Sequence, residues 1–116
     1  MFTALSNSNS FSYAFEKIRN AITVPGESNI HAATRLGLDV LARQYAVFRQ
    51  ELDAAGELDS WEYDLDTYDH CIVSLQRYFA GNSSGMSERD ARIFSHYLQC
   101  QHEGFVDLAE ELAADR

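Results

Sequence analysis

The chain has 116 residues, of which 46% are hydrophobic and 12% aromatic, so it can fold as one domain around a core without disulfides or metal. Its formal net charge of −9 argues against direct binding to nucleic acids or to anionic membranes. It has no stretch as long as the roughly 18 apolar residues of a membrane span, and its N-terminus does not resemble a secretory signal. Two cysteines are too few for a disulfide framework, so we expect a cytoplasmic protein with reduced thiols at Cys71 and Cys100.

The first predicted helix covers residues 11–22. Ser10 can cap its N-terminus, and Pro25 is expected to break it in the turn that follows. Residues 1–9 lead into this helix through the polar stretch SNSNS, and we expect them to be flexible or loosely packed. Apolar residues then recur at steps of four, three and four, which is the spacing of one buried helical face. These residues are Phe11, Phe15, Ile18 and Ile22.

The second predicted helix is longer and runs from Ser28 or Asn29 to about Ala55, with Gly56 suited to the C′ position. Its main apolar stripe consists of Ile30, Thr34, Leu38, Leu41, Tyr45, Phe48 and Leu52. A second apolar set, about 120° away around the helix, consists of Leu36, Val40, Val47 and Ala54. Two apolar faces predict neighbours on two sides, so we expect this helix to be central. Gly37 inside it indicates either a close helix crossing or a break.

The third predicted helix starts near Asp59 or Ser60 and ends before the loop GNSSGM. Its stripe consists of Trp61, Leu65, Tyr68, Ile72, Leu75 and Phe79. The fourth follows Ser87, which together with Asp90 resembles a capping box. Its stripe consists of Phe94, Leu98, Phe105, Leu108 and Leu112. Gly104 lies inside this helix and lowers its helix propensity, so the sequence leaves open whether the helix is continuous or breaks at this residue.

No window of the sequence alternates apolar and polar residues with period two, so we expect an all-α fold. Because short connections favour antiparallel neighbours, the predicted architecture of residues 1–116 is a single-domain antiparallel bundle of about four helices, with an irregular orthogonal array as the alternative. Nine large side chains are expected in its core. They are Phe15, Leu41, Phe48, Trp61, Ile72, Phe79, Phe94, Leu98 and Phe105.

Patterns that are typical of metal and catalytic sites are incomplete. Three aspartates within residues 64–69 are spaced like calcium ligands, but the segment lacks the glycine and glutamate of an EF-hand loop. A di-iron bundle needs Glu-x-x-His pairs, and the chain has none. His96, Cys100 and Glu103 share one helix face, yet a structural zinc site normally needs a fourth ligand. We therefore expect no metal, no other cofactor and no enzymatic activity, and a metal protein or enzyme that uses the His96 face is the alternative.

Most aromatic residues fall on the apolar stripes and are expected in the core. Tyr13, Tyr63 and Tyr78 fall beside the stripes or at their edges. Because exposed aromatic side chains are enriched at protein interfaces, these three are the aromatic residues that we expect to contact a partner.

Residues 51–69, ELDAAGELDSWEYDLDTYD, contain eight carboxylates and no Lys or Arg. At about 100° per residue, Asp59, Glu62, Asp66 and Asp69 form one band beside the apolar stripe. The helix dipole favours carboxylates in the first turn and so accounts for Asp59 and Glu62, but it does not account for Asp66 and Asp69. We predict that these four acids, with Tyr63 as an apolar anchor, bind a partner protein that has a basic surface.

A second group of acids opposes the dipole at the C-terminal end of the fourth predicted helix, which favours a role in binding over one in stability. This group consists of Glu103, Asp107, Glu110, Glu111 and Asp115. The predicted function is inhibition of a target by occupying its basic, nucleic-acid-binding surface. In size, acidity and lack of catalytic motifs the chain is similar to phage-encoded inhibitors such as anti-CRISPR proteins, a likeness that no specific motif carries. The alternatives are an immunity protein that neutralises a toxin and a structural or assembly subunit, and the surface permits a homodimer.

Overall fold

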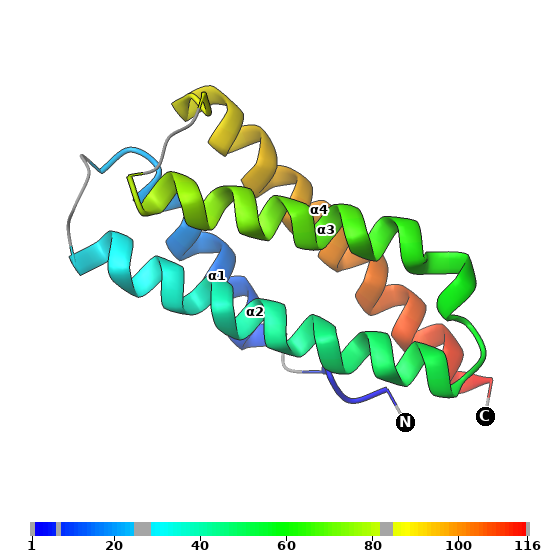
Figure 1. Ribbon diagram of the computed structural model, residues 1–116. Helices are drawn as coiled ribbons and strands as arrows, with labels where there is room; N and C mark the ends of the chain where they lie inside the picture. The colour runs from blue at the N-terminus through cyan, green and yellow to red at the C-terminus, as the bar shows by residue number, and fades with distance from the viewer. Residues whose placement is uncertain (1, 7, 25–28, 82–84, 116) are drawn as a thin grey trace.

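The computed structural model describes residues 2–6, 8–24, 29–81 and 85–115, and within these ranges it contains four α-helices and no strand (Figure 1). The helices are α1 (Ser8–Ala21), α2 (Asn29–Ala54), α3 (Leu58–Phe79) and α4 (Glu88–Ala114). Neighbouring helices run antiparallel, and each packs against two others, so α2 lies between α1 and α3 while α4 lies between α3 and α1. The predicted antiparallel four-helix bundle is confirmed. The helix break predicted at Pro25 and the cap predicted at Ser28 lie outside the described residues.

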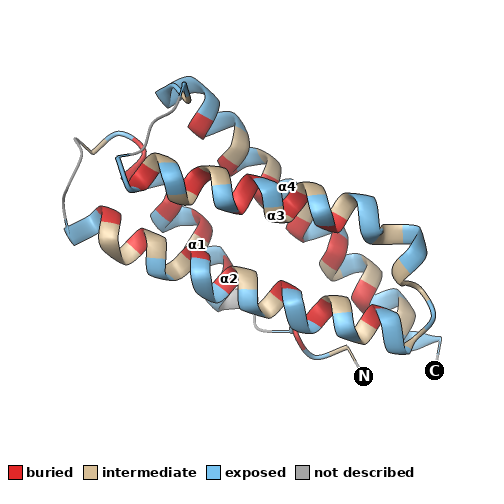
Figure 2. Cartoon of the chain, viewed as in Figure 1, coloured by how far each residue is buried: buried red, intermediate tan, exposed pale blue. Residues whose placement is uncertain are grey.

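The interior of the bundle is filled by one apolar stripe from each helix (Figure 2). Seven of the nine predicted core residues are buried. The other two, Trp61 and Phe94, are only partly buried and pack against the edge of the core. Each lies in the first two turns of its helix, near an end of the bundle, where fewer neighbouring side chains are available to cover a large ring.

The prediction of a second buried face on α2 is wrong. Leu36, Val40 and Val47 are 65%, 51% and 44% exposed, and Ala54 is exposed as well. The helix does have two neighbours, α1 and α3, but both pack against the same main stripe, because adjacent corners of a four-helix bundle share one interior. The second apolar set therefore faces outward.

Neither explanation for Gly37 applies. The helix α2 is continuous through this residue, and no neighbouring atom lies within 4 Å of the position that a Cβ would take, so there is no close crossing. Gly104 likewise lies inside a continuous α4. The main stripe of α2 differs from the prediction at its start, because Ile30 is 51% exposed and the neighbouring His31 is buried instead.

The C-terminus of α2 has the predicted glycine cap. Gly56 adopts a positive φ of 75°, which favours glycine. Its N–H donates to the Asp53 carbonyl at 3.0 Å, and the N–H of Glu57 donates to the Leu52 carbonyl at 2.9 Å. These two hydrogen bonds form a Schellman motif, which satisfies carbonyls at the helix end and turns the chain sharply toward α3.

The other helix ends agree less uniformly with the sequence patterns. The capping box before α4 is confirmed: Asp90 N–H donates to Ser87 Oγ at 3.1 Å, and Ser87 N–H donates to the Asp90 carboxylate at 3.4 Å. By contrast, α1 begins at Ser8, three residues before the predicted start. The helix α3 begins at Leu58, and no side chain caps its N-terminus.

The N-terminal segment was expected to be flexible or loosely packed, but its described part, residues 2–6, packs against the bundle. Ala4 and Leu5 belong to the core. The carboxylate of Glu51 accepts hydrogen bonds from the backbone N–H of Thr3 at 2.8 Å and of Ala4 at 3.2 Å. A side chain near the end of α2 therefore ties this segment to the bundle, and the first carboxylate of the acidic run has a structural role.

Candidate protein-binding surface

The predicted binding residues lie on the first half of α3, whose buried stripe fixes the rotation of the helix. Asp59, Glu62 and Asp66 are exposed, and Tyr63 is 81% exposed. Asp69 is partly buried, since 48% of its side chain is exposed. All five side chains are therefore at least partly accessible to another molecule.

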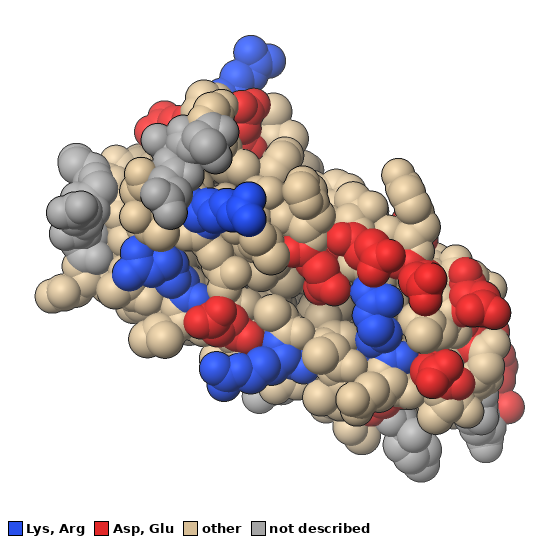
Figure 3. Space-filling view, viewed as in Figure 1, with Lys and Arg blue, Asp and Glu red and all other residues tan. Residues whose placement is uncertain are grey.

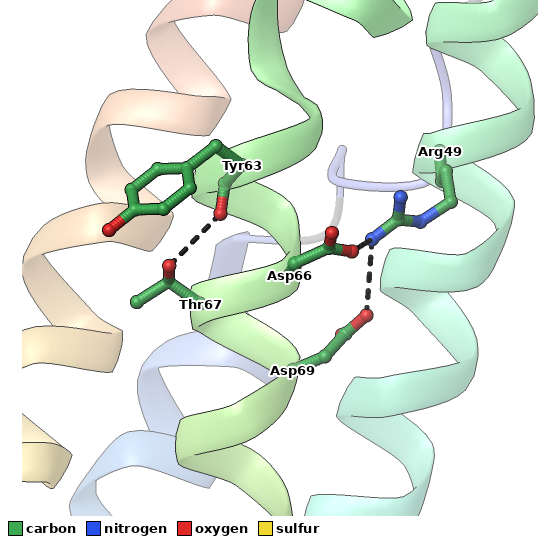
Figure 4. Close-up of polar contacts among 5 residues, drawn as sticks. All are labelled: Arg49, Tyr63, Asp66, Thr67 and Asp69. Carbon is green, nitrogen blue, oxygen red and sulfur yellow. Dashed lines mark hydrogen bonds and ion pairs between the residues drawn. The ribbon is translucent and has the colours of Figure 1, made fainter.

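Two of these acids share one basic residue that the sequence did not reveal. Arg49 on α2 donates through Nη2 to the carboxylate of Asp66 at 2.8 Å and to that of Asp69 at 3.3 Å (Figure 4). This arginine links α2 to α3. Its ion pairs give Asp66 and Asp69 a structural role, whereas helix capping does not account for these two acids. Ion pairs this exposed contribute only about 0.2–1 kcal/mol each, so the bridge positions the side chains more than it stabilises the fold.

The carboxyl group of Asp69 has a perturbed environment. The pKa of this group is raised above its ordinary value, and burial is the largest cause. The charge and hydrogen bond of Arg49 lower the pKa, whereas the negative charge of Asp66 raises it further. Asp69 therefore takes up a proton more readily than an exposed aspartate does. Because two carboxylates face one guanidinium, this part of the surface keeps a net negative charge.

The structure separates Tyr63 from the acidic band. Residues 62 and 63 point about 100° apart around a helix. Figure 4 shows the Tyr63 ring on the side of α3 away from Arg49, while the carbonyl of Tyr63 accepts a hydrogen bond from the Thr67 hydroxyl at 3.0 Å. One partner surface would have to cover two faces of α3 to contact both the tyrosine and the paired aspartates.

The other two predicted surface tyrosines differ from each other. Tyr13 is 62% exposed, and Lys17 Nζ lies 5.3 Å from the centre of its ring. Tyr78 is partly buried and its hydroxyl donates to the Ile22 carbonyl at 3.3 Å, so the expectation of a surface residue is wrong there.

The two acidic groups of the sequence meet at one end of the bundle, where α2 connects to α3 and where α4 ends. Arg49 is the only Lys or Arg between residues 44 and 76, and there is none between residues 93 and 115. On the face that Figure 3 shows, acidic side chains gather at this end and most basic side chains lie toward the other. Nine carboxylates at this end make no ion pair with any described residue, and we call them the acidic pole. They are Asp53, Glu57, Asp59, Glu62, Asp64, Asp107, Glu110, Glu111 and Asp115.

Among the described residues, features for other functions are sparse. His96 Nε2 lies 3.4 Å from Cys100 Sγ on α4, but no group of three or more His, Cys, Asp or Glu residues is arranged to hold a metal ion. Both cysteines, the buried Cys71 and the exposed Cys100, are free thiols. None of the described helices has the length and apolar character that crossing a membrane requires.

Arg49 is the residue of this surface that sequence reasoning missed. It lies on α2, 17 and 20 positions before its two partners, so no spacing within α3 could reveal it. Its position did offer a signal, because it directly follows Phe48 of the main stripe and therefore lies at the border of the buried face. Comparison with known proteins adds no functional information: no protein family matches the chain, and no curated protein or solved structure is significantly similar to it.

Proposed function

We propose that this protein acts by binding another protein through the acidic pole, and that it inhibits its target by occupying a basic surface that handles nucleic acid. The observation that carries the proposal is the concentration of unpaired carboxylates at one end of a small helical rod. A dense negative potential of this kind speeds association with a positively charged partner and competes with phosphate groups for the same arginines and lysines. In this respect the protein would work as phage-encoded inhibitors of the anti-CRISPR kind do, or as an immunity protein works against a basic toxin.

The pairing of Asp66 and Asp69 with Arg49 divides the predicted surface into two parts. Asp59 and Glu62 are exposed and make no ion pair with a described residue, so their charges are fully available to a partner. The charges of Asp66 and Asp69 are partly neutralised by Arg49. We therefore assign the larger share of steering to Asp59 and Glu62.

The test begins with affinity capture by the immobilised protein and by two variants that each remove two negative charges. In one variant, Asp59→Asn and Glu62→Gln alter the acidic pole. In the control, Glu16→Gln and Glu88→Gln alter exposed acids outside it. A basic, nucleic-acid-handling protein should be captured by the wild type and the control, and should be depleted in the pole variant.

Association rates of the captured partner then separate steering from non-specific charge effects. The pole variant should associate roughly three- to tenfold more slowly than wild type at low salt, and the difference should shrink at high salt. Asp66→Asn with Asp69→Asn should have a smaller effect. Equal rates and equal salt dependence in all variants would show that the acidic pole is only a solvated surface.

The exposed apolar set on α2 favours a second candidate, a structural or assembly subunit. Leu36, Val40 and Val47 form an outward-facing apolar stripe, and surfaces of this kind are common at protein interfaces. A subunit of this type would self-associate through α2 without any other macromolecule, which distinguishes it from the first candidate.

A further inference from the structure

A polar hollow lies between α1 and α4, toward the end of the bundle opposite the acidic pole. Its volume is about 480 Å³, and no aspartate or glutamate is among the described residues that line it. In a protein of net charge −9, a hollow that is lined by basic and neutral polar side chains is an exception to the general composition. The residues that matter for its chemistry are Arg19 and Asn20 from α1 and Arg92, Ser95, His96 and Gln99 from α4.

Two arginines from different helices line this hollow. Arg19 Nη1 donates to Gln99 Oε1 at 3.1 Å, which spans the gap between α1 and α4 and holds one guanidinium at the hollow. Each guanidinium has five N–H donors, so this hydrogen bond leaves most of the Arg19 donors for a ligand. Arg92 pairs with Glu88 at 3.3 Å, but both side chains are more than half exposed, and such a pair is weak enough for an anion to compete with it.

Ser95 adds a hydroxyl group to the lining of the hollow. The residue as a whole is only 4% exposed, so its position in the wall is fixed by packing. A serine hydroxyl can donate one hydrogen bond and accept others. An oxygen atom of a ligand in the hollow would be a suitable acceptor.

The chemistry of the lining selects the class of ligand. One guanidinium fork satisfies the two oxygens of a carboxylate, whereas two forks together with a hydroxyl and an imidazole suit the several oxygens of a phosphate group. A volume of about 480 Å³ exceeds that of a phosphate ion and leaves room for the organic part of an ester. The molecule is 47 Å long, several times the Debye length of about 8 Å at physiological salt, so the acidic pole does not prevent an anion from binding here.

We propose that this hollow is a binding site for a small phosphorylated molecule, with Arg19 and Arg92 as the main ligands of the phosphate group and the Ser95 hydroxyl as a further donor. The site is independent of the proposed binding of a basic protein, since the two use opposite ends of the bundle.

The experiment is a titration of the isotope-labelled protein with inorganic phosphate, ribose 5-phosphate and, as an uncharged control, ribose, followed by NMR chemical shifts. Saturable shifts at Asn20, Ser95 and Gln99 are expected with both phosphates and not with ribose. Arg19→Gln and Arg92→Gln should each weaken binding by about tenfold or more, as expected for the loss of a charged hydrogen-bonding partner. The matched control is Arg43→Gln, which removes one exposed positive charge from α2.

Three results would overturn the proposal. One is the absence of saturable binding by either phosphate. Another is equal affinity in wild type, Arg19→Gln and Arg43→Gln, which would indicate general attraction of anions to the surface. The third is binding to vesicles that contain phosphatidic acid without any response to ribose 5-phosphate, which would assign the site to a lipid headgroup. Circular dichroism of each variant verifies that the exposed substitutions leave the fold intact.

Discussion

At the scale of single residues, the core contains a hydrogen-bonded pair of polar side chains. The Tyr45 hydroxyl and His102 Nδ1 are 2.6 Å apart, and both residues are buried. Burial raises the pKa of Tyr45 far above its ordinary value and lowers the pKa of His102 from 6.5 to about 4. At neutral pH the tyrosine therefore keeps its proton and the imidazole is neutral, so one hydrogen bond joins two uncharged groups.

The low pKa of His102 predicts that the protein is sensitive to mild acid. The unfolded chain takes up a proton near pH 6.5, whereas the folded protein does so only near pH 4, so the free energy of unfolding should fall as the pH is lowered between these values. The total loss is about 3 kcal/mol. Urea unfolding at a series of pH values measures it.

The variant His102→Asn is the control for this effect. It removes the titrating group, so the free energy of unfolding should depend less on pH between 6.5 and 4 than in wild type. The raised pKa of Asp69 acts in the opposite direction, but it is present in both proteins and cancels in the comparison. Identical pH profiles would show that His102 is not responsible.

The sequence predicted the exposure of individual residues better than their partners. It identified Asp59, Glu62 and Asp66 as surface residues because their angular positions follow from the stripe of α3. The link from Arg49 to α3 depends on how two helices are rotated against each other, which periodicity does not contain. The sequence did not reveal the burial of His102. This residue follows Leu98 by four positions on the buried stripe, but its polar side chain does not by itself indicate a core position.

At the scale of elements, the hydrophobic periodicity predicted all four helices, and their ends agree where a cap has a specific sequence. The glycine at residue 56 and the Ser87 capping box were recognisable from the sequence. The direction of the second apolar set of α2 was not, since periodicity shows that a face is apolar but not that another helix covers it. The sequence also did not show whether α2 and α4 are continuous through their interior glycines, Gly37 and Gly104.

Gly37 and Gly104 lie in continuous helices with open space beside them, which leads to a stability prediction. Gly37→Ala and Gly104→Ala should each raise the free energy of unfolding by about 0.5–1 kcal/mol, because both residues are helical and a Cβ would meet no atom within 4 Å. Gly56→Ala is the matched control and should destabilise, because a φ of 75° strains alanine. Thermal unfolding of the three variants measures all effects, and a less stable Gly37→Ala variant would contradict the open environment.

At the scale of the whole molecule, one aromatic side chain connects distant parts of the chain. The Phe48 ring is fully buried, lies 5.8 Å from that of Phe105 on α4, and lies 6.3 Å from that of Phe2 in the N-terminal segment. Its neighbours thus come from both ends of the sequence. Removing this ring leaves a cavity that no single helix can fill by moving.

We expect Phe48→Ala to lower the free energy of unfolding by about 3–5 kcal/mol, as large-to-small changes in a core do. Ile93→Ala removes an apolar side chain that is 54% exposed, and it should change stability by no more than about 0.5 kcal/mol. Chemical denaturation compares the two variants. Similar, small losses in both would mean that Phe48 is not a central core residue.

The order in which the helices pack has a consequence for folding kinetics. Most packed pairs are consecutive in the chain, and bundles dominated by such local contacts fold in microseconds to milliseconds. The exception is the pair of α1 and α4, the first and last helices, whose contacts require a long loop to close. Where α1 packs against α4, the His102 ring lies against the rings of Phe11 and Phe15, at centroid distances of 4.3 and 5.3 Å. We therefore expect the contacts that enclose His102 to be the slowest to form.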